Sequence, residues 1–194
     1  MATSGRRERK KAATRQALAD AALELFLERG YDAVTVADVA DAADVSVTTL
    51  FNHFPGGKPA LVFDQEEDVR AGLVDAVVGR ESGCTVLEAV RRHLRAQVAV
   101  AGEHREGFAR FRALLAGTPA LVEHARSIWA RDEEALAAAI VSTTPGTEPF
   151  DAAVIAHFVV EGLHLASARP DATAALDRVL DLLDGGWREP VTGR

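Results

Sequence analysis

Apolar residues recur along this chain at intervals of three and four positions, which is the period of an α-helix. The first segment of this kind begins at Thr14. Its apolar face consists of Leu18, Ala21, Ala22, Leu25 and Phe26. No segment alternates strictly between apolar and polar residues, and aromatic residues make up only 6% of the sequence. The pattern predicts an all-α protein with about nine helices.

The helical spacing continues after residue 60, with breaks at clusters of Gly, Pro, Ser and Thr. The expected helices span 60–78, 86–100, 108–115, 121–140, 152–168 and 172–183. The single cysteine, Cys84, cannot form an internal disulfide, and no uninterrupted apolar run is long enough to span a bilayer. We therefore expect a cytoplasmic chain without a membrane partner.

Capping residues mark two helices in the first part of the chain. Thr14 is a suitable N-cap for the first helix, and Gly30 is a suitable left-handed C-cap. Thr35 begins the second helix, and Asp38 three residues later completes a variant of the capping box. Asp44 follows in a turn, where Asp tolerates left-handed backbone better than most residues do. Two short helices joined by such a turn predict a helix-turn-helix.

The segment "VSVTTLFNHFPGGK", residues 45–58, reads as the second helix of that motif, with Ser46 as its N-cap and residues 55–57 as its stop. Its apolar arc consists of Val47, Leu50, Phe51 and Phe54. Its polar arc consists of Thr48, Thr49, Asn52 and His53. An ordinary surface helix would carry Lys, Glu and Arg on its outward face. A helix-turn-helix places its second helix in the major groove of DNA, which suits an uncharged polar face.

The run "ALADAALELFLERGYDAVTVADVADAADVSVTTLFNHFPGGKPAL", residues 17–61, resembles the N-terminal domain of the TetR family of one-component transcriptional regulators. The residues that carry the resemblance are Phe26, Gly30, Thr35, Val39, Ala40, Val45, Ser46, Thr49, Leu50, Phe51, His53, Phe54 and Lys58. The sequence departs from the family pattern in three places. Asp44 stands where Gly is usual, Phe51 stands where Tyr is commoner, and Gly57 adds one residue before Lys58.

The resemblance implies that the chain binds double-stranded operator DNA. The residues expected at the DNA are Thr35, Ser46, Val47, Thr48, Thr49, Phe51, Asn52, His53 and Lys58. Hydroxyl groups can bind phosphates or base edges, and an Asn side chain can pair with adenine through two hydrogen bonds. In the family, the positions of Thr49, Phe51, His53 and Lys58 tend to touch the DNA backbone. The segment at Thr35 places the N-terminus of its helix against a DNA phosphate.

Positive charge is concentrated at the N-terminus, although the net charge of the chain is −7. The first fifteen residues contain only one acidic side chain, that of Glu8. Their basic residues are Arg6, Arg7, Arg9, Lys10, Lys11 and Arg15. We expect residues 1–11 to form a flexible basic arm that either neutralises DNA phosphates or only aids solubility. The helix-turn-helix domain is then expected at 12–57, and a helical ligand-binding and dimerisation domain at 58–194.

By the same resemblance, the C-terminal domain should form a homodimer and bind an effector. The expected dimer-forming helices span 152–168 and 172–183, where small residues (Gly162, Ala166 and Ala175) would permit close helix contact. The expected apolar face of the first of them consists of Ile155, Phe158, Val159, Gly162 and Ala166. The candidate effector-binding residues are His93, Phe108, Phe111, His124, Ile128, Trp129, His157, Glu161 and His164. Their apolar and aromatic members could equally be core packing, and they predict a small apolar or aromatic effector.

Three polar residues, His157, Glu161 and His164, share one side of the expected helix at positions i, i+4 and i+7. Such a trio could bind a divalent metal, form a pH-sensitive cluster or hydrogen-bond a polar ligand. A wet or interfacial polar stripe is the more common outcome of this spacing. We therefore expect no metal and no cofactor.

The leading hypothesis is a homodimeric repressor that a small molecule releases from its operator. An alternative is a regulator whose C-terminal domain binds a protein partner or no effector. A third reading, an all-α enzyme, has only scattered His, Glu and Asp residues in its favour. The sequence contains no P-loop, dinucleotide fingerprint, GxSxG, HExxH or cysteine pair, so we expect a protein that is not an enzyme.

Overall fold

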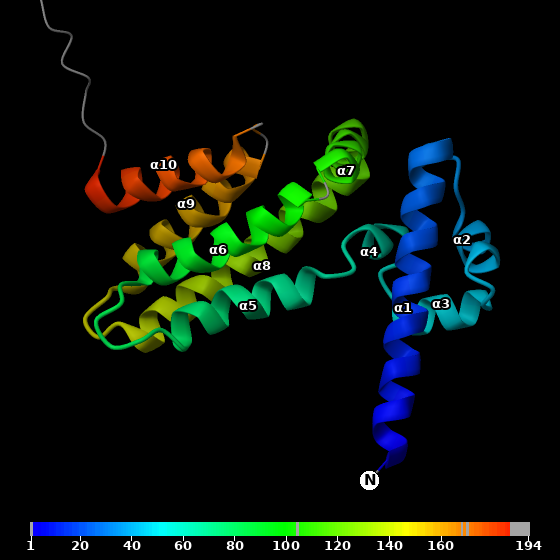
Figure 1. Cartoon of the computed structure of the whole chain (residues 1–194), viewed down its shortest axis with the longest axis horizontal. Helices are drawn as coiled ribbons and strands as arrows, with labels where there is room; N and C mark the ends of the chain where they lie inside the picture. Colours follow the sequence, from blue (N-terminus) through cyan, green and yellow to red (C-terminus); the bar gives the residue numbers. More distant parts are fainter. Residues whose placement is uncertain (1, 104, 168, 170, 187–194) are drawn as a thin grey trace, which may run out of the picture. The chain divides into compact units, whose positions relative to one another are not determined.

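The computed structural model describes the backbone of residues 2–103, 105–167, 169 and 171–186, and their side chains except those of 2–4, 99–103 and 105–108. The described residues form ten α-helices and no strand, which confirms the all-α prediction (Figure 1). The helices of the first half are α1 (Ala2–Arg29), α2 (Val36–Ala42), α3 (Val47–His53), α4 (Lys58–Val62) and α5 (Glu66–Val78). Those of the second half are α6 (Val86–Glu103), α7 (Arg105–Gly117), α8 (Pro119–Thr143), α9 (Pro149–Ser167) and α10 (Ala172–Gly185).

The helices fall into two compact units, and the chain passes between them more than once. The first unit combines Met1–Glu66 with Glu106–Arg126, and the second combines Glu67–Arg105 with Ser127–Arg194. The first unit therefore holds α1 to α4, almost all of α7 and the start of α8. The domain boundary expected at residue 57 lies inside this first unit.

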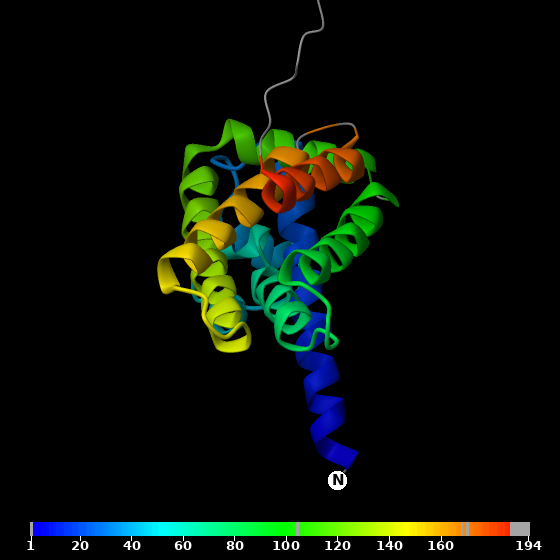
Figure 2. The ribbon, with the colours of Figure 1, turned by 90° about the vertical axis from the view of Figure 1, so that its left-hand side faces the viewer.

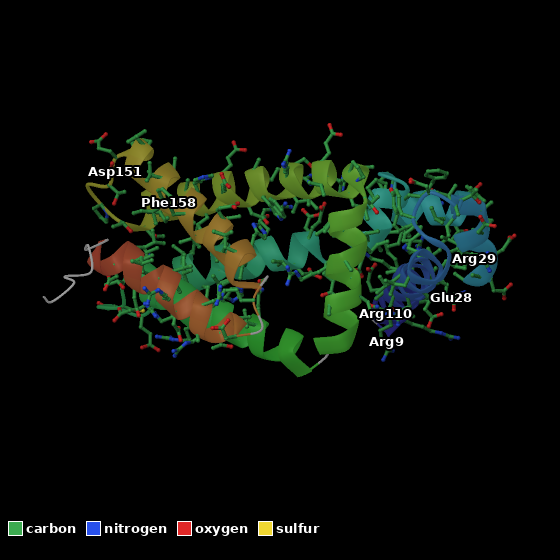
Figure 3. All side chains as sticks on the ribbon, turned by 90° about the horizontal axis from the view of Figure 1, so that it is seen from above. Arg9, Glu28, Arg29, Arg110, Asp151 and Phe158 are labelled. Carbon is green, nitrogen blue, oxygen red and sulfur yellow. The ribbon has the colours of Figure 1, made fainter. Side chains whose placement is uncertain are left out.

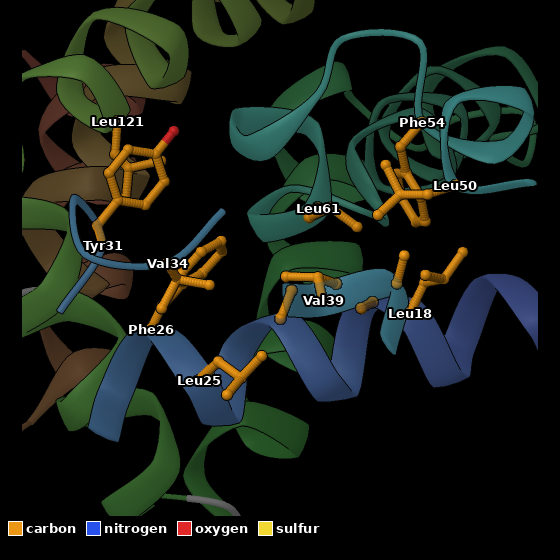
Figure 4. Close-up of a cluster of buried hydrophobic side chains, with 13 residues drawn as sticks. Leu18, Leu25, Phe26, Tyr31, Val34, Val39, Leu50, Phe54, Leu61 and Leu121 are labelled. Atoms are coloured by element: carbon orange, nitrogen blue, oxygen red, sulfur yellow. The ribbon is translucent and has the colours of Figure 1, made fainter. Parts of the chain in front are cut away.

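A shared apolar core holds α1 to α4 together (Figure 4). Its fully buried large side chains are Leu18, Phe26, Val34, Leu50, Phe54, Leu61 and Leu121. Two of these, Leu50 and Phe54, come from α3 and from its C-cap. Burying such side chains is worth about 1.5–3 kcal/mol each, so the core fixes the short helix α3 on α1 and α2.

The helix ends of the first unit follow their capping residues as the sequence predicts. Gly30 has a φ of 83° and its N–H donates to the carbonyl of Phe26 at 3.0 Å. At the start of α2, the hydroxyl of Thr35 accepts from the N–H of Asp38, and the Asp38 carboxylate accepts from the N–H of Thr35. The capping box is therefore confirmed.

Helix α1 begins earlier than predicted, at Ala2. Thr14, the expected N-cap, lies inside the helix and donates its hydroxyl hydrogen bond to the carbonyl of Lys10 at 3.0 Å. The segment expected as a flexible arm is thus helical in its described part. Arg, Lys, Glu and Ala dominate residues 6–13, and these residues have high helix propensity whatever their charge.

The single helix expected over 60–78 is divided into α4 and α5. The interruption lies at 63–65, where Phe63 leaves the helical conformation with φ −113° and ψ 47°. The carbonyl of Asp64 accepts a hydrogen bond from the Arg15 guanidinium at 2.8 Å. A partner 49 positions away cannot be read from local spacing, which explains the missed break.

In the second unit, α10 packs on α9 and α6. Gly162 of α9 meets Val179 of α10, because a Cβ at Gly162 would collide with the Cγ1 atom of Val179. Ala166 is also buried, at 1% exposure. The close helix contact expected at Gly162 is thus present between two helices of the same chain.

The same packing divides the apolar face predicted for α9. Val159 joins Gly162 and Ala166 in the buried part of the helix, whereas Phe158 is 52% exposed. The exposed side chain of Phe158 is visible on α9 in Figure 3. Periodicity identified the apolar residues of this helix but could not say which of them α10 covers.

Helix α9 is also, among the described residues, the one helix long and apolar enough to cross a membrane, judged by length and composition. Because polar residues interrupt its apolar sequence, this helix is not one of the uninterrupted apolar runs on which the sequence-based expectation rests. A helix packed into a protein core meets the same criterion. Here one side of α9 packs on α10, and the helix carries His157, Glu161 and His164.

We expect Gly162→Ala to lower the free energy of unfolding by about 1–3 kcal/mol, because the added methyl group overpacks the contact with Val179. Chemical denaturation measures the loss. The double variant Gly162→Ala/Val179→Ala should recover part of it, since the smaller side chain makes room. A single variant as stable as the natural chain would contradict the α9–α10 contact.

Candidate nucleic-acid interface

The turn between α2 and α3 has the conformation expected from its sequence. Asp44 has a φ of 53°, in the left-handed region. Its N–H donates to the carbonyl of Asp41 at 3.1 Å, and the N–H of Val45 donates to that of Ala40 at 2.9 Å. Asp44 thus takes the conformation that Gly would adopt at this place without a steric penalty.

Helix α3 starts at a side-chain cap. The hydroxyl of Ser46 accepts a hydrogen bond from the N–H of Thr49 at 3.1 Å, and the two hydroxyl groups lie 2.9 Å apart. The cap predicted for this helix is confirmed. It satisfies one of the backbone N–H groups that the first turn of a seven-residue helix leaves without a helical partner.

Only part of the predicted apolar arc of α3 is buried. Leu50 and Phe54 are 0% and 1% exposed, whereas Val47 and Phe51 are 37% and 45% exposed. The core therefore meets α3 along one edge of the arc, and the other edge faces outward. Val47 and Phe51 thus belong to the predicted apolar arc but are not buried in the core.

The outward surface of α3 combines those two apolar side chains with small polar ones. Ser46, Thr48 and Asn52 are exposed, and Thr49 and His53 are half-buried. None of these residues carries a carboxylate or an ammonium group. Hydroxyl and amide groups can donate and accept at base edges and phosphates, and apolar atoms can contact thymine methyl groups. The expected DNA contacts of these residues stay predictions.

Two further residues expected at the DNA have partners within the unit. The ammonium group of Lys58 donates to the carbonyl of Tyr31 at 2.6 Å and lies 4.2 Å from the centre of the Tyr31 ring. At the start of α2, the hydroxyl and the N–H of Thr35 both bond to Asp38. These bonds lower the pKa of the Asp38 carboxyl, so a carboxylate already occupies the N-terminus of α2.

Arg15 connects α1 to the end of α3. Its guanidinium donates to the carbonyl of His53 and to that of Asp64, each at 2.8 Å, and lies 4.3 Å from the centre of the Phe54 ring. The carbonyl groups at a helix C-terminus carry partial negative charge and favour such a cation. Sequence reasoning counted Arg15 only as one of the basic N-terminal residues, because no local signal reveals its distant partners.

His53 lies at this same junction. Burial lowers the pKa of its imidazole, and the positive charges of Lys11 and Arg15 lower it further. The Nδ1 atom of His53 is buried without a hydrogen-bond partner among the described residues. The ring is therefore neutral at pH 7, and the positive charge beside α3 comes from α1.

The residues expected to bind an effector are divided between the two units. Phe111 and His124 belong to the first unit, where both contact Phe63, with ring centres 6.3 and 5.4 Å apart. Ile128 and Trp129 belong to the second unit. The side chain of Phe108 lies outside the described residues.

Two histidines of the second unit are half-buried, and each has one buried ring nitrogen without a hydrogen-bond partner among the described residues, Nε2 in His93 and Nδ1 in His164. The His164 ring stacks on Trp129 at 3.8 Å between centres, and burial lowers its pKa to about 4. Burial also lowers the pKa of His93, whose ring lies against Gly72. Both rings are neutral at pH 7.

The trio on α9 is not a cluster. His157 is exposed and its Nδ1 atom lies 3.1 Å from a carboxylate oxygen of Glu133, whereas His164 stacks on Trp129. Within the described part of the chain, no group of three or more His, Cys, Asp or Glu side chains could hold a metal ion. The two histidines therefore have different partners, both of which belong to α8.

The fold and this surface define an all-helical protein with an N-terminal helix-turn-helix, whose second helix displays an uncharged polar face. Residues 18–64 match the family model described as bacterial regulatory proteins, tetR family. This segment of the chain therefore carries the N-terminal domain of the TetR family. The resemblance stated from the sequence is thereby confirmed.

Curated relatives agree with this assignment. TcmR of Streptomyces glaucescens, a helix-turn-helix transcriptional regulator, is 35% identical over 103 residues, which cover 53% of this chain and 44% of TcmR. The transcriptional repressor KstR2 of Rhodococcus jostii is 37% identical over 70 residues, 36% of this chain and 32% of KstR2. The chain spans about half the length of these relatives or less. They are named as regulators, in agreement with the expectation that this chain is not an enzyme.

Solved structures share the fold over nearly the whole chain. The FadR repressor of Thermus thermophilus, in complex with lauroyl-CoA, has a TM-score of 0.57 at 24% identity and covers 93% of this chain and 98% of its own. The SmeT–triclosan complex has a TM-score of 0.56 at 21% identity and covers 94% and 98%. At these identities the likeness establishes the fold.

We expect the free energy of unfolding to decrease as the pH is lowered from 6.5 to about 4, because of His164. Its pKa is about 4 in the folded chain against 6.5 for an unperturbed histidine, so the unfolded chain binds more protons between these values. Stability is complete above pH 6.5 and falls toward pH 4, by roughly 2 kcal/mol for a partly exposed ring.

The variant His164→Phe keeps an aromatic ring on Trp129 but cannot titrate. Urea unfolding at pH 7 and at about pH 4.5 should therefore show a smaller loss of stability for the variant than for the natural chain. Near-ultraviolet circular dichroism at pH 7 checks that the aromatic packing is retained. Equal losses for both chains would show that His164 does not cause the dependence.

Proposed function

We propose that this chain is a sequence-specific DNA-binding transcriptional regulator in the cytoplasm, acting as a homodimeric repressor. The observation that carries the proposal is the outward surface of α3, where Thr48 and Asn52 are exposed. The helix itself is capped at Ser46 and held on the core by Leu50 and Phe54. A capped helix held by a core on one edge presents the opposite edge rigidly. The family match over residues 18–64 supports the same function.

Helix α3 would read base edges with few groups. Asn52 can pair with adenine through two hydrogen bonds, and Thr48 can bond to a base or bring its methyl group against thymine. The exposed side chains of Val47 and Phe51 add apolar contact area on the same helix. Because no Arg or Lys lies on this face, we expect operator half-sites that are read mainly through A·T base pairs.

Two copies of α3 are needed to read a palindromic operator. On α9, large apolar side chains remain exposed within one chain. These are Phe150, Val154, Phe158 and Leu165, at 76%, 37%, 52% and 60% exposure. Leu182 of α10 is 41% exposed. A second copy of the chain would bury this apolar surface, and the family resemblance supports a dimer contact on the same two helices.

An effector would act by changing the spacing of the two α3 helices. Successive major grooves on one face of DNA lie about 34 Å apart, so a different spacing weakens binding of both half-sites. A ligand that binds the mismatched state more tightly shifts the population toward it. We expect that ligand in the second unit, where Trp129 supplies an aromatic face and His93 and His164 each have an unpartnered ring nitrogen. A small aromatic or apolar molecule with one or two hydrogen-bonding groups fits these residues.

Selection of bound sites from randomised DNA tests the DNA-binding proposal. The purified chain should enrich a palindrome with half-sites about one helical turn apart. The variant Thr48→Ala/Asn52→Ala should bind that site at least tenfold more weakly, since each lost base contact is worth about 1–3 kcal/mol. Thr147→Ala, on the second unit, is the control and should bind as the natural chain does. Enrichment of no sequence would overturn the proposal.

Light scattering after size-exclusion chromatography tests the dimer. Phe158→Glu should shift the chain from dimer to monomer, because a charge would be buried in the apolar contact. Val78→Glu is a matched control, since Val78 of α5 is 54% exposed and Phe158 is 52% exposed. A dimer that persists in Phe158→Glu, or dissociates equally in both variants, would place the contact elsewhere.

A further inference from the structure

The first turns of α1 form a helical extension without apolar packing. Every residue from Gly5 to Ala13 is exposed, and the first buried side chain of the helix is Leu18. Figures 1 and 2 show this segment continuing past α2 and α3. Its basic residues are Arg6, Arg7, Arg9, Lys10 and Lys11, and its only acidic residue is Glu8.

Arg15 gives this extension a defined orientation. Because its guanidinium bonds to the carbonyl of His53, the side of α1 that carries Arg15 faces the C-terminal end of α3. At about 100° per residue, Lys11 and Arg7 lie about 40° and 80° around the helix from Arg15. Arg6, Arg9 and Lys10 lie about 120° or more away. The basic residues therefore form two rows on α1. Only the row of Lys11 and Arg7 lies near the side of α1 that faces the end of α3.

Lys11 stands at the start of that row. It lies close enough to His53 that its charge disfavours the protonated imidazole. Going from Lys11 to Arg7, the helix rises about 6 Å away from α3. The row thus extends the outward polar surface of α3 with positive charge, which the helix itself lacks. Arg9, in the other row, donates from Nε to the carbonyl of Gly5 and so folds back on its own helix.

We propose that Arg7 and Lys11 form a phosphate-binding row, which holds the DNA backbone next to the base pairs that α3 reads. This inference rests on the proposed DNA-binding function. We identify DNA as the partner of this row from charge complementarity. A row of cations beside the uncharged outward surface of α3 matches the phosphates that border the groove in which α3 would lie. Phosphate contacts fix the register of a helix in the groove, and the Arg15 bonds give the row a fixed place relative to α3.

Glu8 is the one carboxylate on the same side of α1, about 20° from Arg15. It lowers the positive charge of the row. Replacing it with a neutral residue of the same size therefore strengthens the contact with DNA. Glu8→Gln supplies a gain-of-binding test, which a variant that fails to fold cannot imitate.

Two double variants separate the row from the general charge of the arm. Arg7→Gln/Lys11→Gln removes two cations of the proposed row, and Arg6→Gln/Lys10→Gln removes two cations at the same spacing on the other side. Each changes the net charge by the same amount. Urea unfolding checks that both retain the stability of the natural chain, as expected for exposed side chains.

The probe is a fluorescent duplex carrying the selected site, either with no flanking base pairs or with about ten, one helical turn, on each side. Affinity is measured over a series of KCl concentrations. On the long duplex, Arg7→Gln/Lys11→Gln should reduce the slope of log K against log salt by about 2 for each bound chain, because each phosphate contact contributes about 0.9. Arg6→Gln/Lys10→Gln should leave the slope nearly unchanged, and Glu8→Gln should raise affinity. On the short duplex the same difference between the two double variants should appear, because the phosphates beside the base pairs that α3 reads belong to the selected site.

Equal slopes for the two double variants on the long duplex would overturn the row and leave only a diffuse basic arm. A difference confined to the long duplex would place the contact in the flanking DNA, away from the base pairs that α3 reads, and would also overturn it. Failure of the proposed function gives a different result, namely a natural chain that prefers no sequence. In that case the two double variants are compared on a long duplex of arbitrary sequence, where the row still predicts that only Arg7→Gln/Lys11→Gln flattens the slope.

Discussion

The arrangement of the first unit depends on the apolar core that fixes α3 on α1 and α2, and the Arg15 guanidinium adds hydrogen bonds to two backbone carbonyls at the edge of that core. These hydrogen bonds join α1 to the last residue of α3 and to the interruption between α4 and α5. The stack of the guanidinium on Phe54 adds a cation–π contact at the edge of the core. One side chain therefore links the end of α3, the chain as it leaves α4 and the helix that carries the basic extension.

Local signals predicted most of the first unit because its helix ends are decided by neighbouring residues. Gly30, Thr35 with Asp38, Asp44 and Ser46 each adopt the conformation or bond that their residue type favours. What periodicity could not supply is the partner of each apolar face. Val47 and Phe51 share an arc with Leu50 and Phe54 but lie outside the core. The role of Arg15 was missed for the same reason, since its partners lie 38 and 49 positions away.

Both units contain buried ring nitrogens that lack a hydrogen-bond partner among the described residues. These are Nδ1 of His53 in the first unit, and Nε2 of His93 and Nδ1 of His164 in the second. Leaving buried polar atoms unpaired costs about 1–3 kcal/mol each. In the proposed function, an effector able to pair with the nitrogens of the second unit would offset this cost. Candidate effector residues could be named from the sequence, but their division between two units depends on contacts between distant helices.

The contact of Gly162 with Val179 also limits how this sequence can diverge. A larger residue at position 162 is tolerated only after position 179 has become smaller, so the order in which the two changes arise matters. If Val179 is replaced by a smaller residue first, the intermediate protein has a small cavity. If Gly162 is replaced by a larger residue first, the intermediate protein is overpacked. Relatives that differ at both positions are therefore expected to carry compensating pairs, and a single residue transferred from such a relative would not fit here.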